Sequence, residues 1–553
     1  MEAMEVSDIL QEVTFGQSAD ESGVFAALCR FQSRFESEAS PGGRARVLQH
    51  TAELLTNASL SWLFPEGESS SLRRQYLKLL TSFVSHAALP ESDTDSDAPP
   101  ARSYEGIPGR CLEVCAVFLA LSAQIEKALV NPPGSSASLG TLVRTLAPTL
   151  CLFCITHLQK QPWSDAASRS RASELQAAVQ RMSGSGSPHE MLSGSPEEER
   201  TGLFGPVLDL LLPDLTKSRW KRKPSVKLVF SWMLLQVARP RLAEHLEKVF
   251  PASLLISDDY WLENKVLGVK CLHHIVLNVP AADLRQFNRA SVLHHMLFSS
   301  LHSFDGTLAQ VIDLQVPCGW SVRVFYLVVN APQVVLPCLI DLLSVIENPA
   351  SVPRTSKHFD QVFRHILTYM EMEHKLDLRR VYAENLVVLV ERMGVWIIRH
   401  LKRLERVIVG YLEVSDAPEE KARLSILDAL EKTLRIAWPR VERRLEALAR
   451  SLLRFLVDVS SSTSPLREQL MEKASCCLML LECSSRGKLQ VRCIIILGNQ
   501  LAFLRTSPPP SSSQTVLLEV DSSCVPGPVF RCIQSVLCIP GAVGSSPSLT
   551  VPS

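Results

Sequence analysis

Apolar residues recur along most of this chain at spacings of three and four residues, with polar residues between them. The pattern is clearest from Phe359 to Leu481, where the alternation typical of strands is nearly absent. This spacing places each apolar stripe on one side of a helix, which is then buried. Successive stripes predict six helices: Phe359–Met370, Leu378–Met393, Ile397–Leu412, Leu427–Leu434, Val441–Leu456 and Leu470–Leu481.

The connections between these helices are short and carry helix-start signals. We expect Asp416 to cap a helix whose first turn holds Pro418, Glu419 and Glu420, and Pro439 to start the next one. Short connections make neighbouring helices pack antiparallel, and a hairpin recurs over roughly 40 residues, near the period of HEAT-type repeats. The predicted fold class is therefore all-α, an irregular α-solenoid of HEAT-like helical hairpins.

The N-terminal half has the same periodicity with more interruptions. Two polar stretches, residues 90–109 with the acidic run Glu91–Asp97 and residues 183–200 with alternating Gly and Ser, carry too little apolar surface to offset chain entropy. We expect both to be disordered linkers. The helices predicted around them are Gly23–Glu38, Ala45–Asn57, Leu72–Ala87, Arg110–Val130, Leu139–Gln159, Ala172–Met182, Phe204–Leu212, Val226–Val237, Leu242–Val249, Tyr260–Val279 and Ala290–Leu301.

Two later segments do not fit the helical plan. Residues 311–333 are rich in β-branched residues and contain Pro317 and Gly319, and their removal would leave one helical stretch, so we interpret them as an insertion. Residues 486–553 lack a sustained helical period and are predicted to be a disordered tail. The predicted organisation is an N-terminal helical region (1–89), an acidic linker (90–109), helical repeats (110–182), a second linker (183–200), central helical repeats (201–310), the insertion (311–333), C-terminal helical repeats (334–485) and the atypical tail (486–553).

Composition narrows the possible functions. Lys+Arg and Asp+Glu both number 57 in 553 residues, whereas a general polyanion binder carries a basic excess. A membrane-spanning helix needs about eighteen uninterrupted apolar residues, and the sequence contains no such run. We therefore expect no membrane partner. The first 17 residues carry acids and no basic residue, unlike a signal peptide, so we expect a cytoplasmic and nuclear protein whose 15 cysteines are free.

Candidate metal and catalytic motifs are incomplete. Cys151 and Cys154 have CxxC spacing with His157 nearby, but a structural zinc site needs four ligands, so we interpret them as core cysteines. The pairs His273–His274 and His294–His295 lack an HExxH carboxylate. A metal-dependent enzyme built on these groups is a remaining alternative. Phosphate-binding and nucleophile-elbow motifs are missing as well, so we predict no enzyme activity, cofactor, metal site or catalytic residue.

Basic residues gather in two places. Lys217–Lys223 contains Trp220, which suggests either a phosphate-contacting patch with a stacking aromatic or, as we favour, a connection whose Trp docks on the core. The former would suit a HEAT-type adaptor for transport or nucleic-acid-associated assemblies. Ser257-Asp258-Asp259 are interpreted as a helix cap.

The second basic feature is a stripe opposite the apolar side of the Ile397–Leu412 helix. Its members, which we predict as partner-binding residues, are Arg399, Lys402, Arg403 and Arg406. The alternative interpretation is a solvated helix face. On a solenoid the partner-binding interpretation gains weight, because such folds present long surfaces to other proteins.

Long strings in the chain carry a family resemblance. They include LVFSWMLLQVARP (Leu228–Pro240), the 40-residue stretch Pro251–Ala290 and RHLKRLERVIVGYLEV (Arg399–Val414). In these strings the chain resembles the family of the second TEL-two-interacting protein, a subunit of the Triple-T (TTT) co-chaperone complex. Residues 311–333 and the tail after about residue 488 depart from the family pattern.

The resemblance implies a non-catalytic scaffold. Its implied partners are the first TEL-two-interacting protein and the TEL-two protein, and indirectly heat-shock chaperone machinery. The implied role is to support the maturation and stability of phosphatidylinositol-three-kinase-related kinases, and with them the DNA damage response. No direct contact with nucleic acid is expected.

Overall fold

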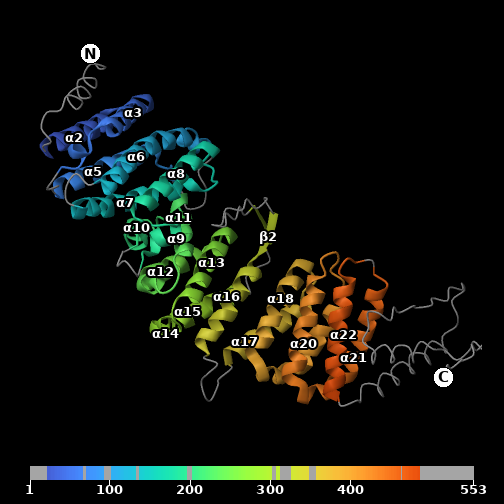
Figure 1. Cartoon of the computed structure of the whole chain (residues 1–553). Helices are drawn as coiled ribbons and strands as arrows, with labels where there is room; N and C mark the ends of the chain where they lie inside the picture. Colours follow the sequence, from blue (N-terminus) through green and yellow to red (C-terminus); the bar gives the residue numbers. More distant parts are fainter. Residues whose placement is uncertain are drawn as a thin grey trace, which may run out of the picture. The chain divides into compact units, whose positions relative to one another are not determined.

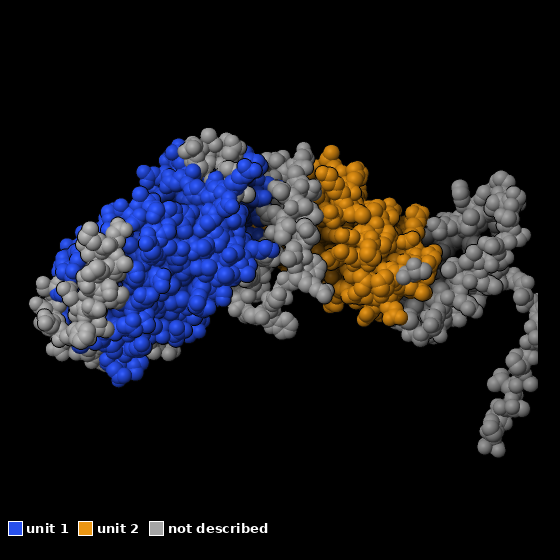
Figure 2. All heavy atoms as spheres, turned by 90° about the horizontal axis from the view of Figure 1, so that it is seen from above, with its two compact units in different colours: residues 1–287, 308–328 blue, residues 288–307, 329–553 orange. Residues whose placement is uncertain are grey.

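Nearly all regular structure in this computed structural model is helical (Figure 1). The structure describes residues 21–65, 70–91, 101–131, 136–195, 202–301, 307–311, 326–347, 357–462 and 464–485. They divide into two compact units, residues 1–287 with 308–328 and residues 288–307 with 329–553, drawn in different colours in Figure 2. The predicted linker residues 92–100, insertion residues 312–325 and tail residues 486–553 lie outside the described residues.

Unit 1 is built from helices that pack on both their sequence neighbours and the helices beyond them. Thus α3 contacts α6 and α6 contacts α8, while α2 contacts α5 and α5 contacts α7 (Figure 1). Its helices are α2 (Glu21–Ser37), α3 (Pro41–Asn57), α4 (Leu60–Leu63), α5 (Ser70–Val84), η1 (Ser85–Ala87), η2 (Ala101–Tyr104), α6 (Ile107–Val130), α7 (Ser136–Leu158), α8 (Ala166–Met182), α9 (Pro188–Ser193), α10 (Phe204–Leu211), α11 (Pro224–Gln236), η3 (Arg241–His245), α12 (Leu246–Ser257), α13 (Leu262–Asn278) and α14 (Ala281–Arg285).

Unit 2 shows the two-layer arrangement of a solenoid. One layer consists of α16, α18, α20 and α22, each of which contacts the next in this series. The other layer consists of α17, α19 and α21. Its helices are α15 (Arg289–Ser300), α16 (Ala331–Ile346), α17 (Lys357–Met372), α18 (Leu376–Met393), η5 (Gly394–His400), α19 (Leu401–Leu412), α20 (Lys421–Val441), η6 (Glu442–Arg444), α21 (Leu445–Ser460) and α22 (Arg467–Ser485). The turn η4 (Gln286–Asn288) spans the boundary between the units.

The predicted fold class is confirmed. The six apolar stripes of the C-terminal repeats are buried except for Leu378 and Leu401, which are half-buried. Among the residues that the structure describes, the exception to helical structure is a two-stranded sheet of β1 (Thr307–Val311) and β2 (Tyr326–Asn330). These strands lie in or beside the segment 311–333, whose β-branched residues set it apart in the sequence.

Polar first turns start several helices earlier than the apolar stripes predict. α3 begins at Pro41 because the Ser40 side chain caps it by accepting a hydrogen bond from the N–H of Gly43. α8 begins at Ala166, where Asp165 and Ser168 exchange the two hydrogen bonds of a capping box. A stripe of apolar residues marks where a helix becomes buried, which is later than where it starts.

Part of the predicted acidic linker, residues 90–109, is helical. η2 (Ala101–Tyr104) lies within it, and α6 begins at Ile107 rather than Arg110. Tyr104 and Ile107 are buried against Trp163, with the Tyr104 and Trp163 rings 5.5 Å apart. Contact with a distant tryptophan therefore orders residues that look like linker in sequence.

The second predicted linker, residues 183–200, also differs from expectation. It contains α9, whose Met191 and Leu192 are each only 1% exposed, while residues 196–200 lie outside the described part of the chain. Ser187 caps this helix by accepting from the N–H of Glu190. Two apolar residues with a core site are enough to order a segment that is otherwise polar.

Two helices of unit 1 are apolar enough to raise the question of a membrane. By length and composition alone, α6 and α7 could each cross one. In the structure they pack inside the unit, where the rings of Phe118 and Phe153 lie 5.2 Å apart and Cys111 and Cys151 are fully buried. Burial within unit 1 accounts for their hydropathy, and the absence of a membrane partner stays a prediction.

The contact between α12 and α13 depends on a glycine. A Cβ atom at Gly268 would lie 2.3 Å from the backbone nitrogen of Ser257, closer than real atoms approach. Gly140 in α7 is also helical, but a Cβ there would meet nothing within 4 Å. The same substitution should therefore have opposite effects at the two positions.

We predict that Gly268→Ala lowers the free energy of unfolding of unit 1 by about 1–3 kcal/mol, because the two helices must separate. Gly140→Ala should raise it by about 0.5–1 kcal/mol, because alanine restricts the unfolded chain and favours helix. Thermal unfolding of the two variants, followed by circular dichroism, tests this. Midpoint shifts of the same sign would contradict the packing described here.

A buried carboxylate holds the connection between α19 and α20. Asp416 accepts hydrogen bonds from the N–H groups of Ala422 (2.9 Å) and Arg423 (3.4 Å) and from Nε of Arg380 (3.1 Å). The predicted cap is confirmed, but α20 starts at Lys421 instead of Pro418. The reason is a turn in which Glu420 has a left-handed φ of 49°.

Removing this carboxylate should cost about 2–3 kcal/mol of stability, because Asp416→Ala leaves the first turn of α20 without its acceptor and Nε of Arg380 without its partner. Asp458→Ala is the matched control: Asp458 accepts from Arg423 at 2.9 Å, but its side chain is 61% exposed. Arg423 is buried but keeps the Val414 carbonyl (3.2 Å) and Glu420 (3.7 Å) as partners, so losing the exposed Asp458 carboxylate should cost at most about 1 kcal/mol. Chemical denaturation of both variants should separate them, and equal losses would sink the capping role.

Candidate functional site

The predicted basic stripe lies along η5 and α19 beside α17. Arg399 pairs with Asp360 (Nη1 to Oδ2, 3.0 Å), and Arg403 pairs with Glu371 (Nη2 to Oε2, 2.8 Å). Arg406 reaches the other oxygen of Glu371 at 3.3 Å. Both acids belong to α17, so three of the four basic side chains tie adjacent helices of one layer together.

The members of the stripe are unequally free to meet a partner. Arg403 also donates to Thr368 Oγ1 (2.8 Å) and the Arg364 carbonyl (3.3 Å), and hydrogen bonding from Arg403 holds the pKa of Glu371 below its usual range. The Arg406 side chain is 65% exposed, and Lys402 is exposed as well. Arg399, whose side chain is 55% exposed, can also be reached but is paired with Asp360, so Lys402 and Arg406 are the exposed members of the stripe on α19 itself.

The second basic feature, Lys217–Lys223, is named here the basic loop. Trp220 within it is 2% exposed, as the docked-connection interpretation predicts. Lys221 pairs with Asp259 at 2.7 Å, and Lys223 pairs with Asp214 at 3.0 Å and Glu91 at 3.4 Å. Trp220 and two of the loop's cations, Lys221 and Lys223, thus make contacts within unit 1 and contribute to its structure.

The CxxC cysteines are core residues, as predicted. Cys151 and Cys154 are fully buried in α7, and the Cys154 thiol lies 3.1 Å from the Cys151 carbonyl. His157 packs on Phe153 with ring centroids 4.8 Å apart, and burial lowers the pKa of His157 to about 4, so its imidazole is neutral. In the chain as described, no three His, Cys, Asp or Glu side chains gather in a way that could hold a metal ion.

The histidine pairs are also bound into the helix packing. His274 bonds through Nε2 to the Val237 carbonyl at 2.7 Å, which joins α13 to the end of α11. His294 stacks on Phe298 with ring centroids 5.8 Å apart, and burial lowers the pKa of His294 to about 4. These contacts give both histidines structural roles.

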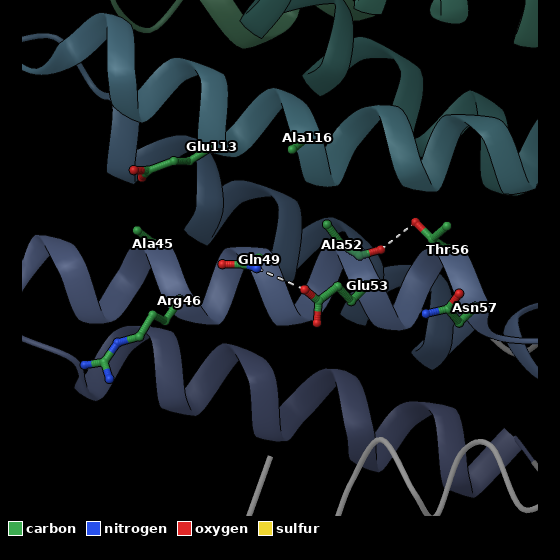
Figure 3. A pocket seen from close by; sticks show the side chains of 9 residues that line it. All are labelled: Ala45, Arg46, Gln49, Ala52, Glu53, Thr56, Asn57, Glu113 and Ala116. Atoms are coloured by element: carbon green, nitrogen blue, oxygen red, sulfur yellow. Dashed lines mark hydrogen bonds between the residues drawn. The ribbon is translucent and has the colours of Figure 1, made fainter. Parts of the chain in front are cut away.

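A groove in unit 1 was not anticipated from the sequence. It has a volume of about 500 Å³ and lies between α3 and α6, with Ala45, Ala52 and Ala116 among its lining residues (Figure 3). Its polar residues have both signs of charge, because Arg46 lies with Glu53 and Glu113. The only sequence signal is two alanines seven residues apart on α3, and the mixed charges do not select a ligand class.

Comparison with known proteins places the chain. No family model matches it. Curated relatives are TELO2-interacting protein 2 of Mus musculus, 38% identical over 84% of this chain and 87% of the relative, and of Homo sapiens, 38% identical over 88% and 90%.

Among solved structures, the chain is similar to Kap121p bound to RanGTP and to importin β. Kap121p is 12% identical with a TM-score of 0.42, covering 91% of this chain and 49% of that one. Importin β is 11% identical with a TM-score of 0.39, covering 91% and 67%. These scores are too low to add to the fold described above. The identity to the curated relatives extends over most of both sequences, and the chain therefore belongs to the TELO2-interacting protein 2 family.

Proposed function

We propose that this chain is a non-catalytic scaffold subunit of a Triple-T (TTT) complex, in which it binds TELO2 and the first TEL-two-interacting protein. The observation that carries the proposal is 38% identity, over 84–88% of the chain, to curated proteins named for interaction with TELO2. Identity spread over nearly the whole length favours a shared binding role over a single shared motif.

The architecture supports a binding role. In unit 2, helices such as α17, α18, α19 and α21 bury one side and leave exposed residues on the other. A row of such sides forms the long surface through which solenoid proteins hold their partners.

We further propose that the complex works with heat-shock chaperone machinery in the cytoplasm and nucleus to support the maturation and stability of phosphatidylinositol-three-kinase-related kinases. A scaffold that holds a client near a chaperone raises their effective concentration without any chemistry of its own. No cofactor is needed for this role.

Within the proposed complex, Arg399, Lys402, Arg403 and Arg406 are the proposed contact. Lys402 and Arg406 are its exposed members on α19, and an acidic surface on the partner would complement them. Arg403 is a poorer probe of this contact than Arg406, because it bonds Thr368 and the Arg364 carbonyl as well as Glu371, so its loss would loosen α19 from α17 more.

The first prediction is that affinity purification of the full chain from cells recovers TELO2 and the first TEL-two-interacting protein, and that Lys402→Glu with Arg406→Glu lowers this recovery at least about fivefold. Quantitative mass spectrometry of the purified complexes measures it. Failure of the unmodified chain to recover either protein would overturn the subunit assignment.

The matched control is Arg171→Glu with Arg181→Glu in α8. Those arginines are also exposed and ion-paired, with Glu174 (2.6 Å) and Glu126 (3.0 Å), but lie in unit 1. Equal loss in the control would mean that overall charge, and not the stripe, governs recovery. Full recovery by the α19 variant would remove the stripe from the interface.

The second prediction concerns the kinases. Depleting the chain should shorten the half-lives of newly made phosphatidylinositol-three-kinase-related kinases, and re-expression should restore them. Pulse-chase labelling measures this directly. Unchanged kinase half-lives after depletion would refute the client role. The subunit role would still stand if the affinity purification had recovered both partner proteins.

A further inference from the structure

A network of buried polar groups fixes the turn between α12 and α13. The side chain of Asp259 is fully buried. It accepts hydrogen bonds from Lys221 (2.7 Å), from the backbone N–H of the adjacent Tyr260 (2.8 Å) and from the Asn264 side-chain amide. Lys227 of α11 donates to the Asn264 carbonyl oxygen at 2.6 Å. The network joins the basic loop, α11 and α13.

This network does not cap a helix. The first cap position of α13 is Trp261, which makes no side-chain capping bond, so the predicted capping role of Ser257-Asp258-Asp259 is wrong. Burial alone would raise the pKa of Asp259, but hydrogen bonds from Lys221 and Asn264 outweigh it and keep the pKa below its ordinary value. A buried, ionised carboxylate is costly unless it is paired in this way.

What the network holds in place is a pair of exposed aromatic side chains. Tyr260 is 60% exposed and Trp261 is 52% exposed, with ring centroids 5.1 Å apart at 39°. Lys221, bound to Asp259, lies 4.8 Å from the centre of the Tyr260 ring. We call Tyr260 and Trp261 the aromatic pair.

Exposing the apolar surface of two rings to water is unfavourable in free energy, and covering it by a ligand would be favourable. Tryptophan and tyrosine dominate binding energy at protein interfaces because they bury large areas with few rotatable bonds. Here the network restricts the turn from which both rings project, so little further ordering would be needed on binding.

The charges beside the aromatic pair indicate the kind of ligand. Lys217, Arg219 and Arg222 of the basic loop are exposed, and Lys221 bridges the loop to Tyr260. The loop already attracts acidic chain, because Glu91 lies 3.4 Å from Lys223. A ligand with carboxylates beside an apolar side chain complements this surface.

We propose that the aromatic pair and the basic loop form a docking site for a short acidic peptide segment of a partner protein, whose apolar side chain covers Tyr260 and Trp261. This site lies in unit 1 and does not depend on the subunit assignment. A nucleic acid fits less well, because the loop's own Trp220 is buried and cannot stack on a base.

Fluorescence anisotropy of the full chain tests the site with three probes. They are a labelled peptide of sequence Asp-Glu-Asp-Phe-Asp-Glu, its neutral counterpart Asn-Gln-Asn-Phe-Asn-Gln, and a labelled twelve-nucleotide oligothymidylate. We expect the acidic peptide to bind at least about tenfold more tightly than the neutral one, and its affinity to fall with added salt. Equal peptide affinities, or preference for the oligonucleotide, would overturn the proposal.

Substitutions locate the binding. Trp261→Ala should weaken acidic-peptide binding at least about tenfold, and Trp261→Phe should restore most of it. Trp438→Ala is the matched control, since Trp438 is 53% exposed in unit 2 and should leave binding unchanged. Equal effects of Trp261→Ala and Trp438→Ala would overturn the site.

Two further variants address the network and the occupant. Asp259→Asn should weaken peptide binding severalfold while the helical circular-dichroism spectrum is retained, because Lys221 and the turn lose their anchor. Asp93→Asn with Asp95→Asn and Asp97→Asn should leave affinity unchanged. A rise in affinity would mean that the chain's own acidic segment covers the aromatic pair, and would overturn assignment to a partner.

Discussion

The structure depends on one constraint: no helix here can bury its apolar side alone. Each stripe becomes buried only against helices in its own and the opposite layer, as α18 does against α16, α17 and α20. A buried leucine or isoleucine contributes about 2 kcal/mol, whereas an exposed ion pair contributes at most about 1 kcal/mol. The stripes of α17 and α19 therefore contribute most to holding these helices together, and the ion pairs beside them add less.

Buried charge is used at the turns, where apolar packing is interrupted. Asp416 organises the connection before α20, and Asp259 organises the one before α13. In both, one carboxylate gathers cations from a different helix or loop together with backbone N–H groups. Such networks contribute conformational definition more than net stability, because desolvation offsets much of their attraction. One defines a helix start and the other displays two aromatic rings.

The hairpin architecture was predictable from the sequence because periodicity reports burial directly. The stripe from Phe359 to Met370 and those after it are local patterns that need no knowledge of distant residues. Helix starts at Pro41 and Ala166 were missed because polar caps precede the stripes. The order around Tyr104 was missed because it depends on Trp163, which is distant in sequence.

The candidate sites show the same division. Periodicity placed Arg399 to Arg406 on one helix side, but it could not reveal that Glu371, a full helix earlier, binds two of them. The aromatic pair fell inside the predicted helix Tyr260–Val279, whereas α13 begins at Leu262, because an apolar run does not distinguish a ring on the core from one projecting beyond a turn. Only the pairing of Asp259 with Lys221, 38 positions apart, decides this.

The pattern of contacts between nearby helices has a consequence for how the protein is made. α20 buries its apolar side against α18, and α22 buries its own against α20. Each hairpin can therefore pack soon after it leaves the ribosome, against helices that were synthesised shortly before it. Growth from the N-terminus then leaves only the newest hairpin uncovered at any moment. A chain of this kind exposes little apolar surface during its own translation, which limits its aggregation. That property suits a protein proposed to support the folding of larger clients.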